Sequence, residues 1–450
     1  MVSAETIESR LTVWEKLAYA MGDASANIAW RGVGTFLFVF YTDVMGLLPA
    51  AVGTLMLVAR LSDGVSDAVM GAIADRTQTR WGKYRPWMLW GALPLGVTLS
   101  LAFTCPSGLG MTGKLVYAYV TYILFTLAYT VQAIPYGALL SVLSPDERER
   151  TSAGSYKMVG AFAGGLVVQG LLLVMKEQFN SYSIPIYILS AVLVVLMPIT
   201  FFGTRERVPP PRQEDGSVWT DLKDLVFRNP PWLVLLAVCA TFYVAVSVKQ
   251  SVTVIYFAHY LGREILCATY LTVISLASVV GAAVTSPLAK RFGKRPVFVT
   301  ALATFAVFSS LQWFCSADAT VTVFVTGAVA EGMSAFFYTL CFVMMGDIAD
   351  YSEWRGGRRA SGLVYSGISF VMKASTGVAG LLVGAVLAHY GYDGRAAETI
   401  PGALPGIRAL MSWIPGVFCA AGAVVMCFYP ITNSLLRRVS AELAERRNAK

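Results

Sequence analysis

Charge is scarce in this sequence. Charged residues make up only 14% of its 450 residues, against about 25% in ordinary soluble domains. Hydrophobic residues make up 56%, and the mean hydropathy is +0.61. A surface so poor in charge cannot keep a chain of this length in solution, which excludes a cytosolic enzyme and a disordered scaffold. The composition therefore indicates a chain embedded in a lipid bilayer.

Patterns for metal, disulfide and phosphate binding are also missing. The only two histidines, His259 and His389, are too scattered for a metal site. The seven cysteines lie in apolar stretches or at their edges without a Cys-x-x-Cys pair, so we interpret them as packing residues. Glycines 356–357 match no phosphate-binding loop. We therefore expect no enzyme, no resident metal and no cofactor. The polar start of the chain, residues 1–16, predicts no signal peptide.

Long apolar stretches are what the sequence has instead. A membrane-spanning helix needs about 20 apolar residues. About twelve stretches reach that length, at 17–42, 48–74, 87–105, 115–141, 154–175, 183–203, 231–260, 265–289, 297–315, 319–346, 362–390 and 406–430. We expect helices, because an open sheet cannot satisfy its backbone in lipid. The predicted fold is thus an all-α integral membrane protein.

Basic residues indicate the orientation of these stretches. With the N-terminus placed in the cytoplasm, 25 of the 35 Lys and Arg residues fall in inner segments and 5 in outer segments. Such a bias predicts a multi-pass inner-membrane protein with both termini cytoplasmic. We attribute the net charge of +8 to loops facing the negative membrane surface rather than to nucleic-acid binding.

A repeated motif divides the chain into two halves. Arg80-Trp81-Gly82-Lys83-Tyr84-Arg85-Pro86 follows the second stretch, and Arg291-Phe292-Gly293-Lys294-Arg295-Pro296 follows the eighth. Parallel six-helix halves around a midplane cavity are the architecture of the major facilitator class. We predict an N-terminal half, a cytoplasmic middle loop, a C-terminal half and a cytoplasmic tail at 1–203, 204–230, 231–430 and 431–450.

Two carboxylates lie at membrane depth in the second stretch. Asp63 and Asp67 are four residues apart, so they share one helix face with Cβ atoms about 6 Å apart. Two carboxylates at that spacing cannot both stay ionised without a counter-charge, so they share a cation or one holds a proton. This chemistry suits a carrier coupled to H⁺ or Na⁺. The alternative is a local pair between Asp63 and Arg60 that is purely structural.

Other polar residues within the stretches are candidate substrate contacts. A charge in mid-bilayer costs at least about 2.5 kcal/mol, so the lone Lys373 must face a cavity and find a partner. Aromatic rings and amides suit sugars, which present apolar ring faces and many hydroxyls. The first stretch carries Asn27 and Trp30 beside Arg31, and the fourth carries Tyr129 and Gln132 beside Thr130. Lys249 and Glu331 are further intramembrane charges to which we assign no role.

Five motifs resemble the glycoside-pentoside-hexuronide:cation symporter family, the relatives of the melibiose carriers. They are Tyr41-Thr42-Asp43-Val44-x-Gly46, Val58-Ala59-Arg60-x-x-Asp63-x-x-x-Asp67, Arg80-Trp81-Gly82-Lys83-x-x-Pro86, Ile134-Pro135-Tyr136 and Asp347-x-x-Asp350-Tyr351-x-Glu353. The resemblance covers nearly the whole chain. It implies a secondary transporter with the major facilitator fold and about 12 transmembrane helices.

The resemblance also implies roles for single residues. It implies that Asp63 and Asp67 bind the coupling cation, with Thr130 near the same site. Lys373 matches a lysine that links cation and sugar, and Tyr129 and Tyr338 match aromatic residues that line the sugar cavity. Lys157 falls near a cavity arginine of the family. Arg150 and Arg359 resemble partners of Asp347 and Asp350 in a cytoplasmic gate.

Departures from the family pattern concern the ion and the substrate. Two family carboxylates that grip sugar hydroxyls or complete the cation site appear here as Asn27 and Ala133. The site then has fewer oxygen ligands, which leaves proton coupling at least as plausible as sodium coupling. Arg31, Lys157 and Lys373 would make the cavity electropositive, which favours an acidic sugar, because an anionic ligand would compensate their charge.

The predicted function is import of a glycoside, pentoside or hexuronide by H⁺ or Na⁺ symport with alternating access. The partners are then a small glycoside and membrane lipid, and we expect a functional monomer. One alternative is a lysophospholipid-type or other small-molecule symporter on the same fold. A second is a membrane enzyme or a sensor that does not transport.

Overall fold

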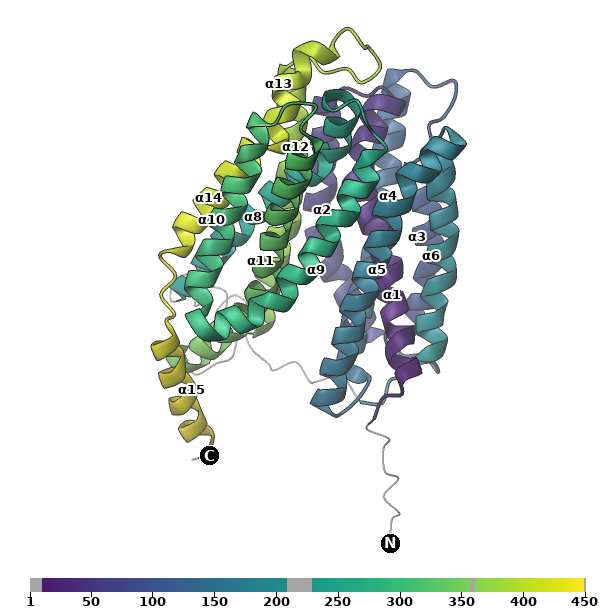
Figure 1. The fold of residues 1–450 in the computed structure, drawn as a ribbon. Coiled ribbons are helices and arrows are strands. Elements are labelled where there is room, and N and C mark those ends of the chain that lie inside the picture. Colours follow the sequence, from purple (N-terminus) through teal and green to yellow (C-terminus); the bar gives the residue numbers. More distant parts are fainter. Residues whose placement is uncertain (1–9, 209–228, 357–360, 449–450) are drawn as a thin grey trace. The chain divides into compact units, whose positions relative to one another are not determined.

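The computed structural model describes residues 10–208, 229–356 and 361–448, and in these residues all regular elements are helices (Figure 1). The elements of the first half of the chain are α1 (Val13–Gly32), η1 (Val33–Leu37), η2 (Phe40–Val44), α2 (Pro49–Arg76), α3 (Arg85–Ala102), α4 (Met111–Val142), α5 (Glu147–Phe179) and α6 (Ser183–Gly203). Those of the second half are α8 (Pro230–Ile255), η3 (Tyr256–Tyr260), α9 (Leu266–Phe292), α10 (Lys294–Leu311), η4 (Gln312–Phe314), α11 (Thr320–Gly356), α12 (Ser361–His389), α13 (Ile400–Met411), α14 (Trp413–Met426) and α15 (Asn433–Asn448).

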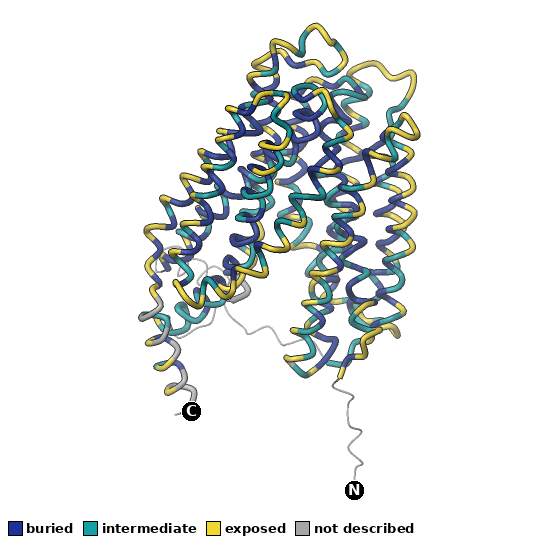
Figure 2. Tube along the Cα trace, in the orientation of Figure 1, coloured by how far each residue is buried: buried dark blue, intermediate teal, exposed yellow. Residues whose placement is uncertain are grey.

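The predicted apolar stretches all fall on helices. Nine helical segments in the described part of the chain are long and apolar enough to cross a membrane. Figure 2 shows exposed positions along both sets of helices, and large apolar side chains such as Val65 (70% exposed) and Phe202 (74% exposed) are among them. In lipid this exposure is ordinary, whereas in water such extended apolar surface marks an interaction site or an aggregation hazard. The all-helical membrane fold is therefore confirmed.

The twelfth stretch, predicted as one segment at 406–430, is two helices. The chain breaks at Ser412, between α13 and α14, where the backbone leaves the helical region. Pro415 explains the break, because it has no N–H to donate to the carbonyl of Met411 and its ring crowds that carbonyl. The tail predicted at 431–450 contains the helix α15.

Two compact units make up the chain. Among the described residues, unit 1 contains 10–208, 263–272 and 391–401, and unit 2 contains 229–262, 273–356, 361–390 and 402–448. The predicted middle loop lies mostly outside the described residues. Two short segments from the second half of the sequence thus pack within unit 1.

Contacts inside the two units repeat. In unit 1, α1 packs against α5 and α6, and α3 packs against α4 and α6. In unit 2, α8 packs against α12 and α14, and α10 packs against α11 and α14. The two basic motifs are also equivalent in backbone, because Gly82 and Gly293 both have φ near +100°, at +113° and +92°. A left-handed φ of this kind favours glycine, which explains why both motifs carry one.

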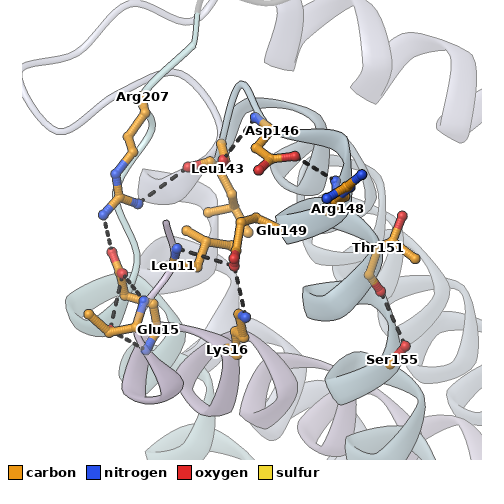
Figure 3. A network of polar contacts seen from close by, with 12 residues as sticks. Leu11, Glu15, Lys16, Leu143, Asp146, Arg148, Glu149, Thr151, Ser155 and Arg207 are labelled. Carbon is orange, nitrogen blue, oxygen red and sulfur yellow. Dashed lines mark hydrogen bonds and ion pairs between the residues drawn. The ribbon is translucent and has the colours of Figure 1, made fainter. Parts of the chain in front are cut away.

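The N-terminal end of α1 is fixed by polar contacts with α5 and the segment after α6 (Figure 3). Thr12 and Glu15 form a reciprocal capping box at the start of α1. Glu15 also accepts a hydrogen bond from Arg207 at 2.6 Å, and Lys16 pairs with Glu149 of α5 at 2.8 Å. These contacts hold together the end of unit 1 that lies nearest the N-terminus.

Candidate functional site

The first carboxylate of α2 is paired with an arginine. Asp63 and Arg60 are 2% and 4% exposed, and an Arg60 Nη1 atom donates to Asp63 Oδ2 at 3.0 Å. The guanidinium also lies over the ring of Trp30 in α1, 4.3 Å from its centroid. Asp63 Oδ1 has no hydrogen-bond partner among the described residues. The local pair that the spacing left open as an alternative is thus present, and it ties α2 to α1.

The second carboxylate of α2 meets α4. Thr130 Oγ1 donates to Asp67 Oδ1 at 3.0 Å, and Ser66 Oγ lies 3.4 Å from Thr130 Oγ1. Asp67 is half-buried, whereas Thr130 is only 2% exposed. The structure therefore brings together the three residues expected at the cation site, Asp63, Asp67 and Thr130, on two packed helices, and adds the hydroxyl of Ser66. Carboxylate and hydroxyl oxygens are suitable ligands for a proton or a hard cation.

A further carboxylate, Asp23, was missed in the sequence. It lies on α1 one turn before Asn27, whose amide donates to the Asp23 carbonyl at 3.0 Å and approaches its carboxylate at 3.4 Å. Lys157 of α5 acts electrostatically on Asp23 and lies 5.3 Å from the ring centroid of Tyr136. The rule that identified Asp63 also applies to a carboxylate inside the stretch 17–42. Lys157 therefore has a counter-charge within unit 1.

Arg31 differs from Lys157 in this respect. Its side chain runs along α5, where a Cβ on Gly165 would lie 3.6 Å from Arg31 Nε. Among the residues that the structure describes, Arg31 has no hydrogen bond or ion pair. It is half-buried. The N–H groups of the Arg31 guanidinium are thus available to donate hydrogen bonds to a ligand.

Aromatic side chains lie next to these charges. Tyr129 of α4 packs against Trp30 with ring centroids 5.2 Å apart, so Trp30 contacts both the arginine of α2 and a tyrosine of α4. Gln132 is fully buried beside Gly91 of α3, and neither of its amide atoms has a partner in the described part of the chain. Of the predicted substrate contacts, Asn27 therefore lies on α1, and Tyr129 and Gln132 lie on α4. Both helices belong to unit 1, which also contains the carboxylates described above.

The remaining candidates lie in unit 2. Tyr338 of α11 packs edge-on against Phe242 of α8, with centroids 5.4 Å apart, and Lys373 is half-buried on α12. Lys249 is 6% exposed, 3.5 Å from Ser309 Oγ, and it interacts electrostatically with Glu331. The buried Lys249 of α8 and the half-buried Glu331 of α11 therefore compensate each other's charge.

Two of the four residues expected to form a cytoplasmic gate, Asp347 and Arg150, have hydrogen-bond partners inside their own units. Asp347 accepts a hydrogen bond from Lys294 at 2.5 Å, and Lys294 belongs to the repeated basic motif. Arg150 Nη1 donates to the carbonyls of Ser144 and Pro145, at 2.8 and 3.1 Å. Asp350 is half-buried on α11. Arg359 lies outside the described residues.

No group of three or more His, Cys, Asp and Glu side chains that could hold a metal occurs in the described ranges. The polar groups of unit 1 are instead carboxylates, hydroxyls and amides on neighbouring helices. This arrangement can hold a small cation or a proton, and can hydrogen-bond a hydroxylated ligand.

Comparisons with known proteins identify a family of sugar transporters. Residues 18–433 match the model of a family described as MFS/sugar transport protein. The inner membrane symporter YicJ of Escherichia coli (strain K12) is 35% identical, over 97% of this chain and 95% of that protein. The putative glycoside/cation symporter YagG of the same strain is 32% identical, over 98% and 97% of the two chains.

A third relative is the isoprimeverose transporter of Lactiplantibacillus pentosus, 31% identical over 95% of this chain and 91% of that protein. Among solved structures, a point mutant of the nucleoside transporter NupG superposes with a TM-score of 0.70 at 14% identity. That likeness covers 91% of this chain and 99% of the NupG chain. At such low identity the superposition shows the fold alone.

Proposed function

The chain belongs to the MFS/sugar transport protein family, and from this premise we propose that it imports a glycoside together with a coupling cation. It is a membrane symporter of the sugar type and not an enzyme. Relatives named as a glycoside/cation symporter and an isoprimeverose transporter support a glycoside or pentoside as the substrate class. In our proposal both termini are cytoplasmic, and transport proceeds by alternating access of the two halves.

The observation that carries the proposal is the unequal environment of the two α2 carboxylates. Arg60 compensates Asp63, so the Asp63–Asp67–Arg60 group retains one net negative charge if both carboxylates are ionised. Binding one proton or one Na⁺ neutralises that charge, which makes movement through the low-dielectric membrane less costly. We therefore assign the coupling cation to Asp67, with the hydroxyls of Thr130 and Ser66 as neighbouring oxygen donors.

Replacing Asp67 tests the assignment. Asp67→Asn should abolish concentrative uptake into proteoliposomes under an imposed H⁺ or Na⁺ gradient, because the neutral amide cannot take up a cation. Exchange of internal for external sugar should persist. Asp75→Asn is the matched control, because Asp75 lies on the same helix but bonds Tyr84 and Lys83. Concentrative uptake by Asp67→Asn would place the coupling site elsewhere, and separate H⁺ and Na⁺ gradients identify the ion.

The charge of the sugar is the finer part of the proposal. Asp23 compensates the charge of Lys157. Arg31 on α1 has no such counter-charge among the described residues, so an anionic ligand would compensate its charge. A guanidinium binds a carboxylate through two parallel hydrogen bonds. We therefore propose that Arg31 allows a hexuronide or glucuronide to bind, while the aromatic pair Trp30 and Tyr129 packs on the sugar ring.

Competition between matched sugars tests the role of Arg31. A glucuronide should inhibit uptake of the transported sugar, and Arg31→Gln should weaken that inhibition about tenfold or more, as loss of a charged hydrogen bond predicts. Inhibition by the matched neutral glucoside should not change, which makes that sugar the internal control. Equal binding of the two sugars, unaffected by Arg31→Gln, would leave a neutral glycoside as the substrate.

A further inference from the structure

The motif Tyr41-Thr42-Asp43-Val44-x-Gly46 has no place in the cation or sugar site. It occupies η2 and the turn after it, at the opposite end of the first membrane stretch from the N-terminus. The backbone closes a wide turn there, because Met45 N donates to Phe40 O at 3.0 Å. Gly46 then turns the chain with a φ of +75°. In the orientation proposed above, this is the outer side of the membrane.

Asp43 is the centre of a polar contact with the segment 391–401. Tyr392 donates its phenol proton to Asp43 Oδ1 at 2.8 Å, and Thr42 Oγ1 donates to the same atom at 2.6 Å. The backbone of Gly394 lies so close that an added Cβ would be 2.2 Å from Asp43 Oδ1. The arginine side chain of this segment packs on Gly46, where an added Cβ would be 2.6 Å from Arg395 Cδ. Positions 46 and 394 therefore favour glycine, because a larger side chain would clash there.

A second polar contact holds the segment 263–272 to unit 1. Glu264 accepts hydrogen bonds from Lys176 at the end of α5 and from Tyr182 just before α6, both at 2.5 Å. Lys176 also lies 4.8 Å from the ring centroid of Tyr182. One carboxylate thus joins the ends of two helices to a segment that is distant in sequence.

Each of the two segments satisfies part of its own backbone. In 391–401, Asp393 N donates to Thr399 Oγ1 at 3.1 Å, and Arg395 N donates to Asp393 Oδ1 at 3.0 Å. In 263–272, Cys267 N donates to Glu264 O at 2.9 Å. Detachment of either segment would therefore break side-chain contacts that water can replace, without unfolding the segment.

We propose that the Asp43–Tyr392 and Glu264–Lys176 contacts form a latch that closes the outer side of unit 1 and opens during transport. Asp43 and Glu264 are the two acceptors, and the donors are the hydroxyls of Tyr392 and Tyr182 and the ammonium group of Lys176. These five side chains are positioning residues outside the cation and sugar sites.

The protonation of Tyr392 fits its role as a donor. Burial, with the charge of Asp43 as a further cause, raises the pKa of Tyr392. The phenol is protonated at neutral pH, as an unperturbed tyrosine also is, and it donates to Asp43.

The native Cys267 supplies the test. It is free, fully buried and three residues after Glu264, so opening of the latch should expose it. A membrane-impermeant maleimide is added to the outer face of reconstituted full-length protein, and mass spectrometry measures alkylation of Cys267. Tyr392→Phe should raise the labelling rate about fivefold, as expected for the loss of one hydrogen bond. Tyr390→Phe is the matched control, with the same change two residues away, and should label like the wild type.

A second pair of variants separates opening of the latch from misfolding. Asp43→Asn keeps an acceptor oxygen and should label more slowly than Asp43→Ala, while hydrogen exchange of 391–401 should follow the same order. A folding defect would instead raise exchange throughout the chain. Wild-type rates of Cys267 labelling and of exchange in Tyr392→Phe and Asp43→Ala would overturn the latch. Neither readout needs substrate, so the result is independent of the proposed sugar and of the role of Asp67.

Discussion

Asp63 and Asp67 are the same residue type on one helix face, yet their surroundings give them different roles. Asp63 is buried against Arg60, whose guanidinium lies over Trp30. Asp67 is half-buried and contacts hydroxyl groups. Helical spacing alone does not distinguish the two carboxylates, because it does not predict which of them forms the ion pair with Arg60.

We expect loss of Asp63 to affect stability as well as coupling. Asp63→Asn leaves the buried Arg60 without its counter-charge, which costs about 3 kcal/mol or more of unfolding free energy. Removing both charges together, in Arg60→Met with Asp63→Asn, should recover most of that loss. Thermal unfolding in detergent measures the effect, and Asp67→Asn should unfold near the wild-type temperature. If Asp63→Asn were as stable as the wild type, the Arg60–Asp63 pair would contribute little to the free energy of unfolding.

Sequence reasoning at the residue scale found most of the polar groups but not their partners. Thr130 and Asp67 were expected together and are hydrogen-bonded. Asp23 was missed although the rule that identified Asp63, a carboxylate inside an apolar stretch, also applies to it. It lies nearer the start of the first stretch than Asn27 does. The ring of Trp30 over Arg60 could not be foreseen, since it depends on how α1 and α2 pack in three dimensions.

At the scale of elements, glycines set how closely helices approach. A Cβ on Gly160 or Gly164 of α5 would lie 2.2 Å from the carbonyl oxygen of Ala20 or Ala24 in α1. Small residues four apart on facing helices allow this backbone contact, as in other membrane helix pairs. The same two helices carry candidate substrate contacts, so this packing also positions them. Those contacts are Asn27, Arg31 and Lys157.

A methyl group at this contact should destabilise the protein. Gly164→Ala places a Cβ against backbone that cannot move aside easily, and overpacking of this kind costs about 1–3 kcal/mol. Gly137→Ala in α4 is the matched control, because nothing lies within 4 Å of its added Cβ. The control should be neutral or stabilising by up to about 1 kcal/mol. Equal unfolding temperatures for the two variants would contradict the close contact.

Hydropathy predicted the existence of the helices better than their shape. Every apolar stretch became helical, because a backbone in lipid has few other ways to satisfy its polar groups. The break at Ser412 had a signal in Pro415 that the hydropathy pattern does not weigh. The π-helical turns η1, η2 and η3 at 33–37, 40–44 and 256–260 had no such signal, since hydropathy does not distinguish π-type from α-type hydrogen bonding.

At the scale of the whole molecule, the duplicated contacts explain how one chain presents two similar bundles. The motif at 80–86 and the motif at 291–296 each place a glycine with positive φ before a helix whose first residue is basic. The repeat could be read from the sequence because both motifs must make the same turn. The packing of 263–272 and 391–401 within unit 1 could not, since loop contacts follow from tertiary structure and leave no periodic pattern.

The basic motif of unit 2 leads to a prediction about alternating access. Asp347 is paired with Lys294 of that motif, while Arg150 donates to the carbonyls of Ser144 and Pro145. A partly exposed ion pair is worth at most about 1 kcal/mol, so exchanging partners costs little. We expect Asp347 to exchange Lys294 for Arg150 when the cavity faces outward, which would close the cytoplasmic side.

Cross-linking measures this exchange. In a background without native cysteines, cysteines at positions 150 and 347 should react with a short bifunctional reagent to an extent that depends on substrate and coupling cation. Cysteines at 294 and 347 are the matched control, because both lie in unit 2 and should cross-link equally in every condition. If the 150–347 pair also reacts equally in every condition, the exchange does not occur and Asp347 makes only a static surface pair. If cross-linking of the 150–347 pair depends on substrate and that of the 294–347 pair does not, then positions 150 and 347 approach each other only in some states. That result would support closure of the cytoplasmic side by the Asp347–Arg150 contact.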